Sequence, residues 1–212
     1  MLDRRLSPVS ALAGIAVPGR HGSRTGQPGL VVEELDGLQI VGLAARRGQA
    51  GALAQAIRDR FALDLPTTPR SVAGTGAAFV WSGAEQWLVI AEDGADDLAA
   101  ELRGLAAGLA SVTAQGDGRM VLRISGPAAR EALSAVVAID LHPRSFRTGD
   151  TALTLANHVG VQLRQVDDGP GFELIAFRSY AGSLFHAVMA AGLRFGVEVL
   201  PTRLPGPRSE RC

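Results

Sequence analysis

Cysteine is almost missing from this sequence of 212 residues, because the only one is Cys212 at the last position. A single cysteine cannot close a disulfide within the chain, and it cannot build a cysteine-ligated metal cluster. The sequence therefore does not belong to the disulfide-stapled secreted class. A reducing, cytoplasmic location is the expectation.

The sequence also lacks an excess of charge of either sign: Lys plus Arg and Asp plus Glu both number 21. A neutral chain has no overall field that would attract nucleic acid or an anionic membrane surface. No apolar run approaches the roughly 20 residues that span a bilayer. Pro8 and Pro18 interrupt the N-terminal segment, so it has no signal-peptide core. We expect no nucleic-acid partner and no membrane.

Recognisable catalytic and metal-binding motifs are missing as well. The four histidines have neither a paired spacing nor a cysteine partner, which argues against a metal site: they are His21, His142, His158 and His186. Gly74-Thr75-Gly76 begins like a dinucleotide loop, but Phe79 stands where the third glycine belongs. Ser125 has no glycine two positions before it, which the nucleophile elbow of hydrolases (Gly-x-Ser-x-Gly) requires. We predict no catalytic residue and no metal ligand.

Apolar residues make up 47% of the chain, which is enough for a substantial core. The first half alternates strand and helix patterns. Strands are predicted at 38–43, 77–81, 87–91 and 111–115, and helices over 53–61 and, after Asp96 and Asp97, over 98–109. This β-α-β-β-α-β order is that of a ferredoxin-like fold.

A second unit begins with residues 117–133, where a strand runs through Ser125-Gly126-Pro127 into a helix. Met120, Leu122 and Ile124 alternate with Arg119, Val121 and Arg123, as in a strand with one buried face. Pro127 suits the first position of a helix. Later patterns predict strands at 151–157, 159–166 and 172–177 and a helix over 180–194. The fold class is therefore α+β with two ferredoxin-like βαββαβ-type units, the second partial.

These patterns divide the chain into four parts. Residues 30–116 form the first unit and residues 117–200 a second α+β unit packed on it. Residues 1–29, which contain Pro8, Pro18 and Pro28, form an N-terminal arm or tail, either disordered or ordered on a partner. Residues 201–212 form a C-terminal tail.

Two side-chain groups leave alternatives open. Arg119, Arg123 and Arg130 are predicted to form a solvated or partner-facing surface, with an anion held at the Pro127 helix start as the less favoured interpretation. Trp81 and Trp87 are predicted to pack on the first hairpin, with an interface anchor as the alternative.

The order and spacing of several short segments resemble the gamma subunit of heterotetrameric sarcosine oxidase over nearly the whole chain. These segments are Ser7-Pro8, Gln86-Trp87-Leu88-Val89, the stretch from Asp117 to Arg130, Ile139-Asp140-Leu141-His142-Pro143-Arg144, Asn157-His158-Val159-Gly160-Val161 and Arg178-Ser179-Tyr180-Ala181-Gly182-Ser183.

The resemblance implies a place in a bacterial complex that oxidatively demethylates sarcosine to glycine, with one-carbon transfer to tetrahydrofolate. It implies alpha, beta and delta subunits as partners. It also implies that FAD, FMN, NAD, zinc and tetrahydrofolate are held by those subunits, with no cofactor on this chain. The gamma chain is in turn similar to the folate-binding domain of aminomethyltransferases, the T-protein of the glycine cleavage system.

Folate binders of that fold carry three side chains that can be compared with this sequence. An aspartate lies ten residues before the serine of the Ser-Gly-Pro turn, and here that position is Gln115. A tyrosine lies seven residues before the glutamate of a Gly-aromatic-Glu motif, and here that position is Val166. The glutamate itself is kept as Glu173. The resemblance therefore marks Glu173 as a vestigial folate position, since the other two groups that would hold a pterin are lost.

We expect a non-catalytic structural subunit that supports assembly of the oxidase. The alternative is a folate-binding or one-carbon-transfer protein that uses Glu173. A third hypothesis is an independent small-molecule binding domain with a closed pocket.

Overall fold

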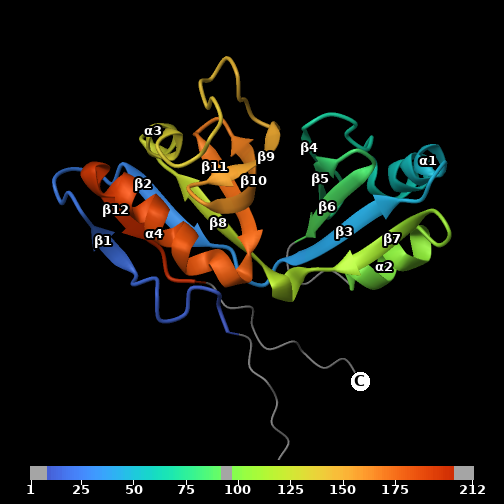
Figure 1. Cartoon of the computed structure of the whole chain (residues 1–212), viewed down its shortest axis with the longest axis horizontal. Coiled ribbons are helices and arrows are strands. Elements are labelled where there is room, and N and C mark those ends of the chain that lie inside the picture. The colour runs from blue at the N-terminus through green and yellow to red at the C-terminus, as the bar shows by residue number, and fades with distance from the viewer. Residues whose placement is uncertain (1–8, 92–96, 203–212) are drawn as a thin grey trace, which may run out of the picture.

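The computed structural model describes residues 9–91 and 97–202, and two β-sheets lie side by side in it (Figure 1). One sheet has seven strands and the other has five. Each sheet has helices on one face only (Figure 1). Asp96 and Ser7 lie outside the described residues.

The five-stranded sheet is the predicted ferredoxin-like unit. Its order is β4 (Ser71–Ala73), β5 (Ala78–Gly83), β6 (Gln86–Ala91), β3 (Gln39–Ala45) and β7 (Ala110–Ala114). Because β6 is antiparallel to both β3 and β5, it separates two strands that α1 (Ala50–Phe61) connects. This is the split βαβ arrangement, and every predicted strand and helix of this half is present.

The core of the five-stranded unit follows from the predicted helical spacing. Leu53, Ile57 and Phe61 of α1 are buried, and Phe61 meets Phe79 edge-on at 5.1 Å between ring centroids. α2 (Leu98–Leu105) begins after Asp97, whose carboxylate accepts a hydrogen bond from the N–H of Ala100 at 3.0 Å. This side chain caps the helix, because the first N–H groups of a helix have no partner within it.

The seven-stranded sheet carries α3 (Ala129–Ser134) and α4 (Ala181–Gly192) on one face. Its order is β1 (Gly19–His21), β12 (Val197–Val199), β2 (Leu30–Glu34), β8 (Arg119–Ser125), β11 (Gly171–Phe177), β10 (Val159–Asp167) and β9 (Thr151–Ala156). Short 3-10 turns lie at Gly116–Gly118, Arg178–Tyr180 and Leu193–Phe195.

Strand β2 crosses the boundaries expected from the sequence. Residues 30–34 were expected to open the first unit, but they pair with β8 and β12 in the seven-stranded sheet. The second unit contains its four predicted strands, β8, β9, β10 and β11, together with the short β12, and β2 is inserted between β8 and β12. The choice of partner strand depends on distant residues, so the local apolar pattern of 30–34 does not contain it.

The N-terminal arm is ordered on the chain itself over its described part. Strand β1 pairs with β12, and Leu12 is buried in the core of the seven-stranded sheet. Glu34, only 5% exposed, accepts hydrogen bonds from Ser10 Oγ and from the N–H groups of Ala11 and Leu12. The buried carboxylate of β2 therefore holds the arm in place.

The junction after β8 differs in detail from its prediction. Helix α3 begins at Ala129 and has six residues, with Pro127 in the preceding turn. Gly126 has φ +105°, and a Cβ there would lie 2.6 Å from the carbonyl oxygen of Gly29. The Ala128 N–H donates to the same carbonyl at 2.9 Å. The turn therefore packs tightly against the start of β2, and only glycine fits at position 126.

The helix-free faces of the two sheets meet through a shared apolar cluster. Its buried members are Ile40, Val80, Leu88 and Ile90 from the five-stranded sheet and Val121 and Ile175 from the seven-stranded sheet. Val121 was predicted on the polar side of its strand. The second sheet covers that side, so β8 is buried on both faces at its centre.

Candidate functional site

Glu173 lies on the helix-free face of the seven-stranded sheet, as the third residue of β11. It is 3% exposed, and its Oε2 accepts hydrogen bonds from Nε and Nη2 of Arg164 at 2.8 and 2.5 Å. Arg164 is directly opposite on β10, and its Nη1 donates to Ser71 Oγ at 3.2 Å. The carboxylate of Glu173 is thus committed to a buried ion pair that also reaches the first sheet.

This pair belongs to a row of alternating charge across four strands. In the strand register Glu33 of β2 is opposite Arg123 of β8, Arg123 is opposite Glu173, and Glu173 is opposite Arg164. Opposite charges on neighbouring strands stabilise the pairing. This row could not be predicted from the sequence, because it depends on the pairing of β2 and β8 with the hairpin of β10 and β11.

Gln115, where folate binders of this fold have an aspartate, is engaged elsewhere. Its Oε1 accepts a hydrogen bond from Arg119 Nε at 2.6 Å, and its side-chain amide lies against Gly42. The guanidinium of Arg119 also lies over the ring of Phe177, 4.6 Å from its centroid. Partial burial lowers the pKa of Arg119 from its ordinary value, because the charged form loses hydration.

The three positions compared with folate binders do not converge on a cavity. Between the Arg123–Glu173 row and the Arg119–Phe177 row lies the row of Val121 and Ile175, which the shared apolar cluster buries. Val166 lies where the register of β10 with β11 shifts. Apolar packing therefore fills the space that separates Glu173 from the Arg119 row.

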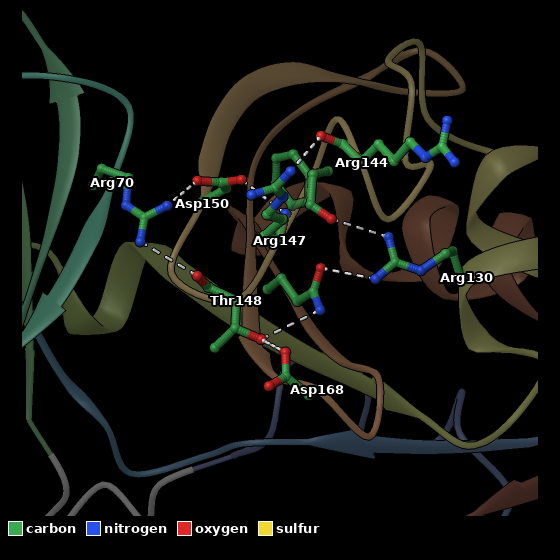
Figure 2. A network of polar contacts seen from close by, with 9 residues as sticks. Arg70, Arg130, Arg144, Arg147, Thr148, Asp150 and Asp168 are labelled. Atoms are coloured by element: carbon green, nitrogen blue, oxygen red, sulfur yellow. Dashed lines mark hydrogen bonds and ion pairs between the residues drawn. The ribbon is translucent and has the colours of Figure 1, made fainter.

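Arg130 is not the surface residue that the sequence predicted. Its guanidinium donates to the carbonyl oxygens of Leu141 and Phe146 and to Gln165 Oε1, the last at 2.9 Å, and it lies over the ring of Phe172. Figure 2 shows Arg130 pointing into this network. The side chain therefore links the loop before β9 to helix α3.

The network continues to the five-stranded sheet through Arg70 (Figure 2). Arg70 forms an ion pair with Asp150, whose other carboxylate oxygen accepts from the N–H of Arg147 at 2.7 Å. The Ser71 N–H donates to Gly149 O at 2.7 Å. These contacts join β4 to the loop before β9, so the two sheets are linked by polar bonds as well as by the apolar cluster.

A groove of about 550 Å³ opens on the helix-free face of the seven-stranded sheet, beyond this joint. Three of its apolar side chains are about half exposed: Leu153 (55%), Leu155 (52%) and Phe177 (55%). Arg119 and Gln162 also line it. Gln162 is 2% exposed; its Nε2 donates to Trp81 O at 2.6 Å, but its Oε1 has no partner in the described part of the chain.

Three further residues singled out in the sequence, Trp87, His21 and His142, have contacts within the chain. Trp87 is buried and its Nε1 donates to Pro66 O at 2.8 Å. His21 Nε2 lies 2.7 Å from Val17 O, and His142 Nδ1 accepts from the N–H of Arg144 at 3.2 Å. Within residues 9–91 and 97–202, no group of three His, Cys, Asp or Glu side chains could hold a metal ion, and no helix is long and apolar enough to cross a membrane.

The model of the sarcosine oxidase gamma subunit family matches residues 46–192. The chain is 37% identical to the sarcosine oxidase subunit gamma of an Arthrobacter species over 161 residues, covering 72% of this chain and 73% of the relative. It is 40% identical to the subunit of the same name from Corynebacterium sp. (strain P-1) over 132 residues, covering 55% and 58%.

Two solved structures share the fold. A chain of the heterotetrameric sarcosine oxidase from Corynebacterium sp. U-96 superposes with a TM-score of 0.71 and 27% identity, covering 82% of this chain and 88% of that one. The glycine cleavage system aminomethyltransferase T from Bartonella henselae superposes with a TM-score of 0.63 and 15% identity, covering 82% of this chain and 48% of that one. The second likeness concerns the fold alone.

Proposed function

This chain belongs to the sarcosine oxidase gamma subunit family, and we propose that it serves a heterotetrameric sarcosine oxidase as a non-catalytic structural subunit. In this role it supports the assembly of a complex that oxidatively demethylates sarcosine to glycine with one-carbon transfer to tetrahydrofolate. The partners are the alpha, beta and delta subunits. They hold FAD, FMN, NAD, zinc and tetrahydrofolate, and the assembly works in the cytoplasm.

The observation that supports this proposal is that Glu173 and Gln115, two of the positions compared with folate binders, are already bonded within the chain. Glu173 is paired with Arg164, and Gln115 is held by Arg119. A buried carboxylate that is already ion-paired is a poor ligand for a new polar group, since binding would leave the arginine without its partner. We infer that Glu173 now stabilises the sheet, and that the aminomethyltransferase-like framework is kept for its shape.

The two sheets are joined to each other by polar contacts. We propose that residues 38–114 and the seven-stranded sheet act as one body in the complex, because the Arg70–Asp150 ion pair and the Arg164–Ser71 hydrogen bond join them. A preformed rigid surface binds partners with a smaller loss of conformational freedom than a pair of mobile domains.

The test is to produce the other oxidase subunits with and without this chain. We expect that omission of this chain lowers the yield of assembled complex and speeds its thermal inactivation, while the sarcosine site of any complex that does form keeps its KM. Size-exclusion chromatography and residual activity after heating measure the two effects. A complex that is equally stable and active without this chain would contradict the proposal.

A further inference from the structure

The groove on the helix-free face has the features of a docking site. We propose that it receives a segment of another subunit of the sarcosine oxidase complex, one that inserts an apolar side chain above Gly160 and places a carboxylate beside Arg119. This inference rests on the proposed function, because it assumes that the chain is a subunit of the complex.

The hollow arises from one glycine in a cross-strand row. Gly160 of β10 is opposite Leu155 of β9, and Phe177 of β11 is opposite Arg119 of β8. Since Val161 is opposite Ala176, the next positions along the two strands place Gly160 beside Phe177. A Cβ at Gly160 would meet nothing within 4 Å. The row therefore has a gap between two large apolar side chains, wide enough for a side chain from outside.

The walls of the groove favour an apolar occupant. Leu153 and Leu155 of β9 and Phe177 of β11 are each more than half exposed, although Phe177 ends a strand whose other residues are all buried. Apolar side chains gathered on one surface mark sites of protein association, and an aromatic ring at the centre of such a site provides much of the binding energy.

The charge of the groove favours an occupant that carries a carboxylate beside its apolar side chain. Among the described residues that line the groove, Arg119 is the one that carries a charge. Its contacts are a neutral amide, Gln115 Oε1, and the ring of Phe177, and no carboxylate of the described residues pairs with it. A partly buried guanidinium without a counter-charge is stabilised by an incoming carboxylate, which it can bind through two parallel N–H groups. An anionic group beside the apolar side chain therefore complements the site.

Gly160→Leu tests the shape of the groove. The new side chain fills the gap, and position 160 has no positive φ that would strain it. Gly51→Leu is the matched control, because Gly51 is exposed on α1 and its Cβ would also meet nothing within 4 Å. In complexes made by co-expression with a tagged chain, we expect Gly160→Leu to weaken capture of the other subunits about tenfold. Gly51→Leu should capture them as the natural chain does.

Arg119→Met tests the charge, with Arg123→Met as its control on the same face of β8. We expect the Arg119 variant to weaken capture at low salt and to lose the salt dependence that the natural chain shows. The Arg123 variant should keep that dependence. Thermal unfolding of all four variants identifies any that fail to fold.

The outcomes separate this inference from the proposed function. If the natural chain captures no oxidase subunit, the proposed function fails. If it captures them and the folded Gly160→Leu and Arg119→Met variants do so equally well, the groove is overturned as the docking site while the subunit role stands. If Gly160→Leu instead abolishes pairing between two copies of this chain and leaves capture unchanged, the inference is likewise overturned.

Discussion

Arg164 and Glu173 lie directly opposite each other on β10 and β11, and the two hydrogen bonds between them end on the same carboxylate oxygen. Their side chains are 11% and 5% exposed, so the pair is buried as a unit. Each charge is tolerated in the interior only because the other is present.

Removal of one member of this pair should therefore cost more than removal of both. We expect Glu173→Ala to lower the free energy of unfolding by about 3–5 kcal/mol, because it leaves a buried uncompensated arginine. The double variant Arg164→Met with Glu173→Leu should recover most of that loss. Urea unfolding followed by the fluorescence of Trp81 and Trp87 measures both. Equal free energies of unfolding for the natural chain and Glu173→Ala would show that the pair does not stabilise the fold.

The chain should not bind tetrahydrofolate with appreciable affinity. Glu173 and Gln115 are engaged within the protein, and the apolar row of Val121 and Ile175 lies between their sites. We expect isothermal titration calorimetry with tetrahydrofolate to give no binding heat up to millimolar ligand. Saturable binding that Glu173→Gln abolishes would support a folate-binding protein instead.

Glu34 should govern the order of the N-terminal arm. Its carboxylate accepts from Ser10 Oγ and the backbone of residues 11 and 12, and Thr202 Oγ1 donates to it at 3.3 Å. Because hydrogen bonds to a charged group contribute about 1.5–3 kcal/mol, Glu34→Ala should destabilise the chain by at least that amount. Limited proteolysis should then cut within residues 10–16 faster.

Glu33→Ala is the control for the arm, since Glu33 is on the opposite face of β2 and faces Arg123. Loss of that cross-strand pair should cost no more than about 1 kcal/mol and leave cleavage of the arm unchanged. Equal cleavage of the two variants would refute the role given to Glu34.

Gly126 and Gly104 should respond to alanine in opposite directions. Gly126→Ala strains a residue with φ +105° and drives a Cβ onto the Gly29 carbonyl, so we expect a loss of about 1–3 kcal/mol from backbone strain alone. Gly104→Ala lies in helix α2 with nothing within 4 Å and should gain about 0.5–1 kcal/mol. Thermal denaturation compares the two. A neutral Gly126→Ala would mean that the turn can move away from β2.

Long helices and strands with a repeating apolar pattern could be predicted from the sequence. Very short strands, and the pairing of strands, could not. The leucines of α2 and the alternation of β8 repeat often enough to reveal helix and strand. Strands β1, β4 and β12 have three residues each, which is too short for any period to appear. Comparison with folate binders selected Glu173, but its partner Arg164 is set by strand register, which no local pattern contains. The groove depends on Gly160 lying between two apolar neighbours, and this too arises only when the strands pair.

The insertion of β2 between β8 and β12 has a consequence for biosynthesis. All five strands of the five-stranded sheet lie within residues 38–114, so their pairing can form as soon as this half leaves the ribosome. β2 is made earlier, but its neighbours β8 and β12 are both made after this half, and Leu30 and Val32 must wait for them with their backbone groups unpaired. Non-local pairing of this kind is slow, and exposed strands favour aggregation during the delay. A chaperone or early contact with another subunit would be of most use to this strand while the ribosome completes residues 119–199.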